Sequence, residues 1–381
     1  LLGSVDSAGV SSTFSTTLYT GNGAVNTINT GIDLAGDGGL VWIKSRTEGT
    51  YGGHALFDTE RGPNKVISTS GDSNISATMA QVTSSSPDKD LTSFNSNGFS
   101  LGVDYYFNKN TNSENYAAWT FRKAPKFFDV VTYTGTGVAG RTVSHNLGDE
   151  VGMLVVKCTS DATLWPVYHR ANTAAPETEY LRLNDTNATT DYTYWNDTAP
   201  TSTEFTLNSH DDVNQTGRTY VAYLFAHDTD ASSLIKCGSY TGNGSTDGPE
   251  IDLGFEPQWL LVKSAGSVEY WWLVDSMRKW LNSGTSNMDI TRPNYHYADL
   301  TEGFCYPTAS GFKVKDTNGA VNSSGVTYIY MAIRASNIPT ITYDPNLQWS
   351  GGTAPTLPAT GETDVITFNT TDGGTTYKSA L

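Results

Sequence analysis

The sequence predicts an all-β protein: three tandem antiparallel sandwiches of the jelly-roll or lectin-like kind, followed by a small C-terminal β module. Three observations lead to this fold class: the composition, a set of segments that recurs three times, and an unbroken apolar run in each copy. Of the 381 residues, 16% are charged, 12% are aromatic and 37 are glycine. Such a composition lacks the charged residues of helical bundles. It favours short strands joined by Gly, Asn, Asp, Ser and Thr turns.

A repeated pentapeptide marks the start of each copy. Tyr19–Gly23 (YTGNG) returns as Tyr133–Gly137 (YTGTG) and Tyr240–Gly244 (YTGNG), with starts 114 and 107 residues apart. Four further elements follow it in the same order in every copy. They are apolar runs ending in lysine (Leu40–Lys44, Met153–Lys157, Trp259–Lys263), mixed strands (His54–Asp58, Trp165–His169, Trp271–Asp275), Phe-centred elements (Gly98–Leu101, Glu204–Leu207, Gly311–Val314) and aromatic strands (Tyr116–Phe121, Tyr220–Phe225, Tyr328–Ile333). Five elements in one order predict three homologous repeats.

The length of the repeat predicts separate bodies rather than a stacked array. Solenoid and propeller units run to roughly 20–50 residues, whereas a unit of ~100 residues can enclose its own core. We therefore expect a rod of three repeats with separate cores that unfold in more than one transition. The boundaries predicted from lapses in the pattern are 1–13 for a tether, 14–125, 126–231 and 232–336 for the repeats, and 337–381 for a C-terminal β-hairpin module.

The strand patterns predict how each element is buried. The apolar run before each lysine is continuous, which indicates a central strand covered on both faces. The last aromatic strand alternates with small residues, as a half-buried antiparallel strand does. Val274–Leu281 is the one stretch expected to form a short helix or a single turn. The glycines of the pentapeptide are expected to provide positive φ or a bulge; the motif lacks the GK[ST] ending of a phosphate loop.

The C-terminal module is predicted to contain a hairpin, because Asp372-Gly373-Gly374 separates two alternating runs. It is too small to be stable alone, and we expect it to pack on the third repeat or on copies of itself.

Charge and cysteine content exclude several classes of function. The formal net charge is −16 and the isoelectric point about 4.6, which opposes binding to nucleic-acid phosphates and to anionic membranes. No apolar stretch of about 18 residues exists, so no membrane insertion is expected. The three cysteines (Cys158, Cys237, Cys305) form no CxxC pair and are predicted to be buried free thiols. No cofactor is predicted.

Candidate chemistry is sparse. Asp58 and Asp275 each precede an arginine by three residues (Arg61, Arg278), and the second repeat has His169 instead. The pair is either a carboxylate in a cleft or an Asp–Arg pair that fixes a turn; the exchange for His169 favours the turn. A glycosidase needs two facing carboxylates, and the repeats offer no second equivalent acid, so we predict no enzyme.

Two Asp-rich segments, His210–Asn214 and Asp228–Asp230, are either calcium sites or solvated turns, and we favour turns because no EF-hand spacing is present.

Carbohydrate binding relies on exposed aromatic platforms together with hydrogen-bonding groups. Trp271 and Trp272 point to opposite faces of a strand, so one is expected in the core and the other at the surface. Tyr192–Asp197 is an insert without a counterpart in the first repeat. The ligand-binding candidates are Trp271, Trp272, Tyr192, Tyr194, Trp195, Tyr295 and His296, and Tyr270, Trp280, Trp165 and Tyr297 are further candidates.

Taken together, Tyr19–Gly23, Leu40–Lys44, His54–Gly62, Ser93–Phe99 and Tyr116–Trp119 resemble a domain that recurs in tail-fibre and appendage proteins of bacteriophages, marine phages especially. That domain looks like a concanavalin-A-like jelly roll. The segment from Trp349 to Tyr377 is similar to a C-terminal segment common in the same class. The second repeat departs most, with Tyr168-His169-Arg170 in place of the Asp–Arg motif. The resemblance implies a structural role in a virion and supplies no catalytic motif.

The expected function is that of a virion structural appendage protein, a tail or head fibre that attaches to host surfaces by multivalent glycan binding. The expected partners are other virion proteins, a host cell-surface glycan or protein, and further copies of the chain, a homotrimer being the first expectation. The expected location is the virion or the extracellular space. Two alternatives stay open: a non-viral secreted carbohydrate-binding protein and, less favoured, a polysaccharide-cleaving enzyme.

Overall fold

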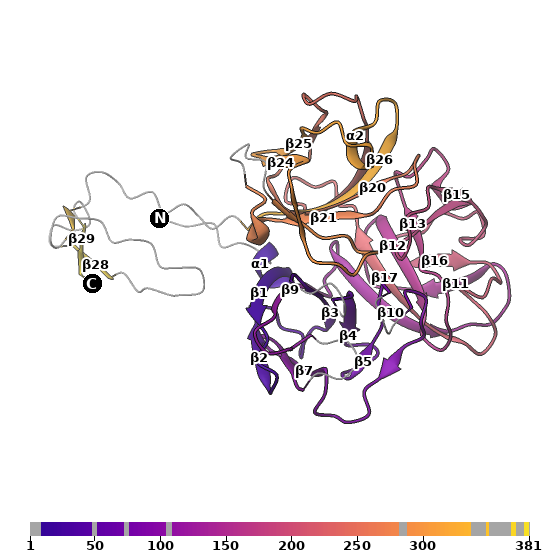
Figure 1. The fold of residues 1–381 in the computed structure, drawn as a ribbon, viewed down its shortest axis with the longest axis horizontal. Coiled ribbons are helices and arrows are strands. Elements are labelled where there is room, and N and C mark those ends of the chain that lie inside the picture. The colour runs from indigo at the N-terminus through magenta and orange to yellow at the C-terminus, as the bar shows by residue number, and fades with distance from the viewer. Residues whose placement is uncertain are drawn as a thin grey trace. The chain divides into compact units, whose positions relative to one another are not determined.

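A computed structural model describes residues 9–47, 52–71, 76–103, 109–281 and 288–336, together with three short strands between 348 and 380. The chain divides into two compact units, Leu1–Ser336 and Asn337–Leu381. In the described residues the regular structure is almost entirely β, and its sheets are antiparallel apart from one short pairing in the second unit, which confirms the predicted all-β fold class (Figure 1).

The elements of the first unit follow the order of the repeats. The first repeat contains α1 (Val10–Thr13), β1 (Phe14–Thr20), β2 (Asn26–Asn29), β3 (Gly39–Ser45), β4 (Ala55–Asp58), β5 (Lys65–Val66), β6 (Val82–Thr83), β7 (Leu91–Asn95), β8 (Gly98–Leu101) and β9 (Asn115–Arg122). The second contains β10 (Phe128–Thr134), β11 (Arg141–Ser144), β12 (Val151–Cys158), β13 (Pro166–His169), η1 (Pro176–Thr178), β14 (Glu179–Arg182), β15 (Thr190–Asp191), β16 (Glu204–Leu207) and β17 (Thr219–Ala226). The third contains β18 (Ile235–Thr241), β19 (Glu250–Asp252), β20 (Pro257–Ser264), β21 (Trp272–Asp275), η2 (Ser276–Arg278), β22 (Met288–Ile290), β23 (Leu300–Glu302), β24 (Cys305–Thr308), β25 (Gly311–Val314), α2 (Gly319–Asn322) and β26 (Thr327–Arg334).

One strand order occurs in all three repeats. The inner sheets run β1-β9-β3-β4, β10-β17-β12-β13 and β18-β26-β20-β21, the second being extended by β14 and β15. Each inner sheet is accompanied by an outer sheet: β2-β8-β7, β11-β16 or β19-β25-β24. Apolar side chains from both sheets meet in one cluster, as Val41, Ile43, Phe99 and Leu101 do in the first repeat. Each repeat is therefore a sandwich of two antiparallel sheets.

The pentapeptide tyrosines have equivalent surroundings. The hydroxyls of Tyr19, Tyr133 and Tyr240 donate to main-chain oxygens 80 to 90 residues later, each at 2.7 Å. Each ring stacks on the first tyrosine of the last strand at 5.0 to 5.2 Å between centroids. The second glycine of the motif has φ near +70° in every copy, which confirms the prediction of positive φ and explains why glycine is needed there.

The apolar runs are buried on both faces, as predicted. One face packs in the core of its own sandwich and the other packs against the other repeats. Along β3, Val41 and Ile43 point into the core of the first sandwich, whereas Leu40 and Trp42 belong to a larger cluster that includes residues of all three repeats. The last strands β9, β17 and β26 are also buried on both faces, so the prediction that they are half-buried was wrong. Local alternation cannot reveal this second covering, because it comes from another repeat.

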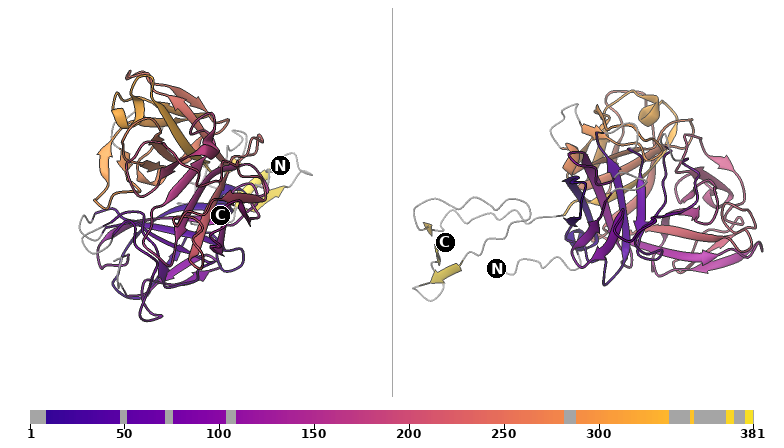
Figure 2. Two further views of the ribbon diagram at one scale, coloured as in Figure 1. Left: turned by 90° about the vertical axis from the view of Figure 1, so that its right-hand side faces the viewer. Right: turned by 60° about the horizontal axis from the view of Figure 1, so that its bottom comes forward.

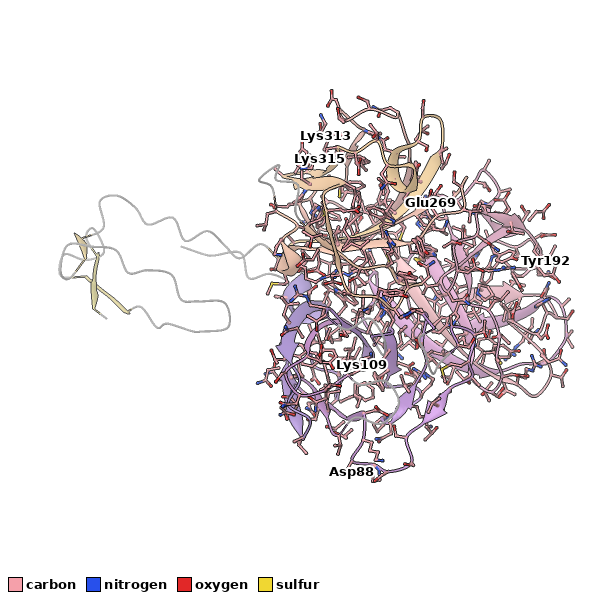
Figure 3. All side chains as sticks on the ribbon, viewed as in Figure 1. Asp88, Lys109, Tyr192, Glu269, Lys313 and Lys315 are labelled. Carbon is pink, nitrogen blue, oxygen red and sulfur yellow. The ribbon has the colours of Figure 1, made fainter. Side chains whose placement is uncertain are left out.

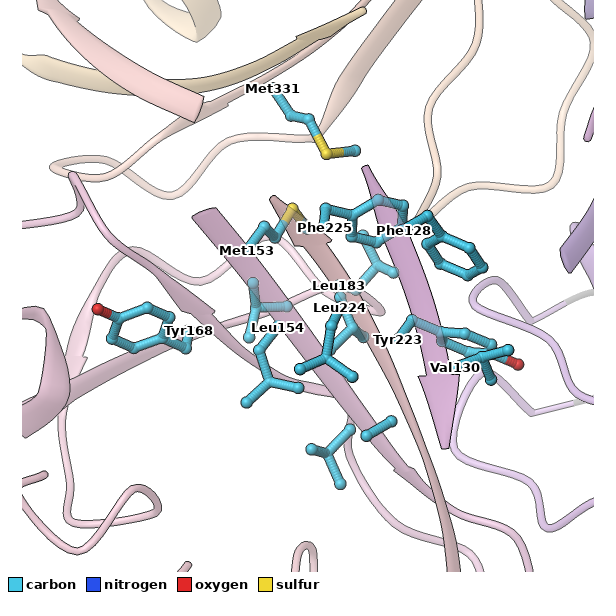
Figure 4. Packing of buried hydrophobic residues seen from close by; sticks show 14 of the residues in the cluster. Phe128, Val130, Met153, Leu154, Tyr168, Leu183, Tyr223, Leu224, Phe225 and Met331 are labelled. Carbon is cyan, nitrogen blue, oxygen red and sulfur yellow. The ribbon is translucent and has the colours of Figure 1, made fainter. Parts of the chain in front are cut away.

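A shared hydrophobic core joins the three repeats. Phe121 of β9 lies 5.5 Å from Phe225 of β17 and 6.0 Å from Trp259 of β20, measured between ring centroids. Figure 4 shows Met331 of β26 packed beside Met153 and Phe225 of the second repeat. A void lined by residues of all three repeats, among them Leu40, Met153 and Leu261, holds about 10 Å³, which is too small for a ligand, so the side chains around it are closely packed.

Loops reach from each repeat to the next. The Thr163 amide donates to Thr78 O at 2.8 Å, which links the second repeat to the first. In the same way the third is linked to the second and the first to the third, through Glu269 N→Thr186 O (2.9 Å) and Asp299 N→Arg46 O (3.1 Å). The three repeats occupy three corners of the first unit in Figure 1 and are grouped likewise in both views of Figure 2.

The expectation of a rod was therefore wrong. The first and third repeats do keep sandwich cores of their own, but all three repeats also contribute to the shared core. In a rod the first and third repeats would not touch, whereas here they share loops and core. The physical reason lies in the apolar runs: their second face must leave water, and the neighbouring repeats supply the cover.

The predicted short helix in Val274–Leu281 is confirmed as the single turn η2, whereas the turns α1 and α2 were not expected. Residues 9–13 of the predicted tether are ordered, and Val10 and Thr13 are buried, which corrects that part of the prediction.

The second unit contains β27 (Gln348–Trp349), β28 (Thr367–Thr370) and β29 (Tyr377–Ala380). Strands β28 and β29 pair antiparallel and β27 pairs parallel to β29. The predicted turn Asp372-Gly373-Gly374 lies outside the described residues.

Candidate functional site

The buried Asp–Arg pairs are structural. In the first repeat Asp58 Oδ2 lies 2.5 Å from Arg61 Nε, and in the third Asp275 Oδ2 lies 2.8 Å from Arg278 Nε. Each aspartate also accepts the amide of its arginine and so closes the turn after the strand. Burial alone would lower the pKa of Arg61, but the Asp58 carboxylate outweighs it and the pKa is raised. The interpretation as a turn-fixing pair is confirmed.

Each of these aspartates also accepts a hydrogen bond from a side chain of another repeat. Tyr223 OH donates to Asp58 Oδ2 at 2.7 Å, and Trp119 Nε1 donates to Asp275 Oδ2 at 2.9 Å. Both carboxylates are therefore held by an arginine and by an aromatic donor in the core, where no substrate can reach them.

The second repeat has His169 in place of the aspartate, and the third repeat, which it contacts, also differs at the position of the aromatic donor. At the position of Trp119 and Tyr223 the third repeat has Met331, which has no hydrogen to donate. His169 Nε2 instead lies 3.0 Å from Tyr330 O, while its Nδ1 accepts the Ala171 amide. This arrangement places the proton on Nε2. Burial lowers the pKa of His169 to about 3.

The segment that carries Tyr295 and His296 connects β22 to β23 and is fixed by its neighbours. Arg292 O lies 3.0 Å from His54 Nε2, and Pro293 O accepts the Thr69 hydroxyl, both contacts coming from the first repeat. Asn294 Oδ1 accepts the Trp271 amide at 3.2 Å. The segment is thus pinned across the interface between the first and third repeats.

Aromatic rings gather around this segment. Tyr295 lies 5.1 Å from Tyr270 and 4.6 Å from Tyr297, and His296 lies 4.4 Å from Tyr297, measured between ring centroids. The Arg292 guanidinium lies over the Tyr270 ring at 4.6 Å. We call Tyr270, Arg292, Tyr295, His296 and Tyr297 the Tyr295 cluster.

The Tyr295 cluster combines accessible rings with unsatisfied donors. Tyr297 is 52% exposed, and Tyr295 and His296 are partly exposed. A hollow of about 20 Å³ is lined by Ile290, Arg292, Tyr295, Tyr297, Ala298 and Leu300. Arg292 Nε and Asn294 Nδ2 are buried and have no hydrogen-bond partner among the described residues. Because Arg292 lines the hollow and is partly exposed, the arrangement can offer ring faces and guanidinium N–H groups to a polar ligand.

The candidates of the second repeat separate into one exposed ring and two structural ones. Tyr192, which is labelled in Figure 3, is 40% exposed. Its ring centroid lies 4.8 Å from that of Tyr194 and 5.2 Å from that of His210. Tyr194 is buried, its hydroxyl donates to Asp212 Oδ2 at 2.5 Å, and burial raises its pKa. Trp195 is buried with Nε1 donating to Glu179 O. Only Tyr192 of this group is available to a ligand.

The expectation that Trp271 or Trp272 forms a surface platform was wrong. They do point to opposite faces, but Trp271 enters the shared core and Trp272 the core of its own sandwich, at 1% and 2% exposure. Trp165 and Trp280 are buried as well.

Sequence reasoning missed Arg292 and Asn294, whose neighbours in the motif RPNYHY were the available signal.

No group of three or more His, Cys, Asp and Glu side chains that could hold a metal ion occurs in the described residues. In the Asp-rich segments, Asp212 is bonded to Tyr194 and to the Leu164 amide, and Asp230 pairs with Lys126. The three cysteines are buried and free, as predicted. Among the described helices, none is long and apolar enough for a membrane span.

Comparison with known proteins gives one family. A family model described as a domain of unknown function (DUF7483) matches residues 9–336. No curated protein matches the chain.

Proposed function

We propose that this chain, which belongs to the DUF7483 family over residues 9–336, is a structural attachment protein of a virion appendage whose third repeat binds surface glycans through the Tyr295 cluster. The observation that carries the proposal is the coincidence, at one surface hollow, of the Tyr295 and Tyr297 rings with the Arg292 side chain, whose Nε has no hydrogen-bond partner among the described residues. The resemblance of the repeats to phage appendage domains supports the virion setting.

A sugar fits this chemistry. Its ring carries C–H groups that pack on an aromatic face and hydroxyls that accept or donate hydrogen bonds. Tyr295 and Tyr297 offer ring faces, and the partly exposed Arg292 side chain, which lines the hollow, offers N–H donors. Because the segment is pinned to the first repeat through Arg292 O and Pro293 O, little ordering is needed on binding.

The rest of the molecule acts as a scaffold in this proposal. The shared core and the loops between repeats hold the Tyr295 cluster on a rigid body. One shallow site of this kind binds weakly, so attachment would depend on several copies of the chain, a homotrimer being the proposed assembly.

The test is glycan binding by the full chain. We expect retention on an array of oligosaccharides and, in calorimetric titration, a loss of affinity of about twofold to tenfold for Tyr295→Ala and for Tyr297→Ala, since stacking on one ring contributes about 0.5–1.5 kcal/mol. Tyr192→Ala, which removes an exposed tyrosine of the second repeat, is the matched control and should bind normally. Absence of any retained glycan would refute the proposal, and loss only in Tyr192→Ala would move the site to the second repeat.

The location of the chain is tested separately by imaging labelled virus particles. Density for the chain on an appendage supports the virion role. A glycan-binding chain found only as a free secreted protein would favour the non-viral alternative.

A further inference from the structure

Around the Tyr295 cluster, the buried carboxylates are paired with other cations, and Arg292 is left over. Asp275, Asp289 and Asp299 are the buried carboxylates of this region, and they are paired with Arg46, Arg278 and Lys279: Asp289 lies 3.0 Å from Arg46 and 3.2 Å from Lys279, and Asp299 lies 3.3 Å from both arginines. Together with the Asp275–Arg278 pair, three carboxylates meet three cations. This network is complete without Arg292.

Arg292 is left without a carboxylate. Within the described residues no Asp or Glu oxygen lies within 4 Å of its guanidinium, and no side-chain hydrogen bond is made by it. Its neighbours are instead the rings of Tyr270, Trp272 and Tyr295, at 4.6, 5.6 and 5.9 Å from the guanidinium carbon. In a chain of net charge −16, this partly buried arginine thus faces aromatic rings and has no acidic partner among the described residues.

The hollow and the cation lie together. Arg292 lines the same hollow as Tyr295 and Tyr297, so a ligand seated on those rings is within reach of its N–H groups. A guanidinium recognises a carboxylate or sulfate through paired N–H···O bonds, which are stronger than bonds to a neutral hydroxyl.

We propose that the Tyr295 cluster selects acidic saccharides, those bearing a carboxylate or sulfate group, with Arg292 as the residue that recognises the anion. This inference rests on the proposed glycan-binding function and specifies its ligand class. The tyrosine rings supply contact area to any sugar, whereas Arg292 decides between a charged sugar and a neutral one.

The experiment uses the full chain on an array of neutral, uronate-bearing, sialate-bearing and sulfated oligosaccharides, followed by calorimetric titration of the best acidic binder and of a neutral oligosaccharide of equal length. Variants are Arg292→Gln and, as a matched control, Arg141→Gln, whose guanidinium lies 5.0 Å from the Tyr133 ring in the second repeat. Melting temperatures of all variants show whether the fold is kept.

We expect the retained sugars to be acidic, and their affinity to fall with added salt and about tenfold to hundredfold in Arg292→Gln. Arg141→Gln should bind as the unmodified chain does. Equal binding of neutral and acidic sugars, or an unchanged affinity in a folded Arg292→Gln variant, would overturn this inference while leaving glycan binding intact. Retention of no sugar at all would overturn both. If Arg292→Gln fails to fold, salt dependence of the unmodified chain decides, since a salt-independent affinity contradicts recognition of an anion.

Discussion

A hydrogen bond between Trp119 and Asp275 joins the first repeat to the third. The indole Nε1 of Trp119 in β9 donates to Asp275 Oδ2 after β21 at 2.9 Å, across 156 residues of sequence. The Tyr223–Asp58 bond joins the second repeat to the first in the same manner, and His169 joins the second to the third through Tyr330 O. Each repeat thus places one buried polar group against the last strand of another.

Replacing Trp119 by phenylalanine should destabilise the chain by about 1–3 kcal/mol in urea denaturation, because the buried Asp275 oxygen loses one of its donors. Trp259→Phe is the matched control: Trp259 is equally buried, but its Nε1 has no hydrogen-bond partner in the part of the chain that the structure describes. It should therefore lose less stability. Equal losses in the two variants would show that the Trp119–Asp275 bond contributes nothing beyond ring packing.

Asp58→Asn tests the cost of an uncompensated buried cation. Arg61 would keep its position without a carboxylate, and such a loss typically costs about 3–5 kcal/mol. Asp37 pairs with Arg122 while half exposed, so Asp37→Asn should change the unfolding free energy by at most about 1 kcal/mol. A small effect of Asp58→Asn would contradict the structural role given to the pair.

Stability should fall in acid through His169. Its pKa is lowered from 6.5 to about 3, so below pH 6.5 the unfolded chain binds a proton that the folded chain refuses. The contribution of neutral His169 to the free energy of unfolding is complete above pH 6.5. It is lost as the pH falls toward 3, at about 1.4 kcal/mol per pH unit. Protonation would also place a hydrogen on Nδ1, which faces the Ala171 amide.

The measurement is the difference in unfolding free energy between pH 7 and pH 4.5 for the unmodified chain and for His169→Gln, which can still donate to Tyr330 O. We expect a smaller difference in the variant, by about 2–3 kcal/mol. His296→Gln, which makes the same substitution at a partly exposed histidine, is measured beside it as the control for the exchange itself. An identical pH dependence in His169→Gln would exclude His169 as the acid-sensitive group.

Much of the fold could be predicted from the sequence because strands and repeats leave local sequence patterns. The pentapeptide starting at Tyr19 and the run Leu40–Lys44 recur with fixed spacing, and a continuous apolar run indicates two covered faces. The partner of the second face is not visible in periodicity. That Trp42 meets other repeats is a long-range relation, and its only trace in the sequence is the joint change to His169 and Met331.

The candidate site could be predicted in part. Tyr295 and His296 were found as an aromatic loop segment, but Trp271 and Trp272 were misplaced because composition gives no measure of burial. Arg292 was not identified because a single arginine carries no signal in the sequence; only the structure shows that it faces the Tyr270 ring and has no carboxylate partner among the described residues.

The shared core is tested most directly by scanning calorimetry of the full chain. If the repeats of residues 9–336 unfold together, the main transition should have a van't Hoff enthalpy equal to its calorimetric enthalpy, about 230 kcal/mol near 60 °C at about 0.7 kcal/mol per residue. Separate repeats would instead show a van't Hoff enthalpy near one third of the calorimetric value, about 75 kcal/mol, or resolved peaks. The first result is predicted, and the second would contradict a core common to the three repeats.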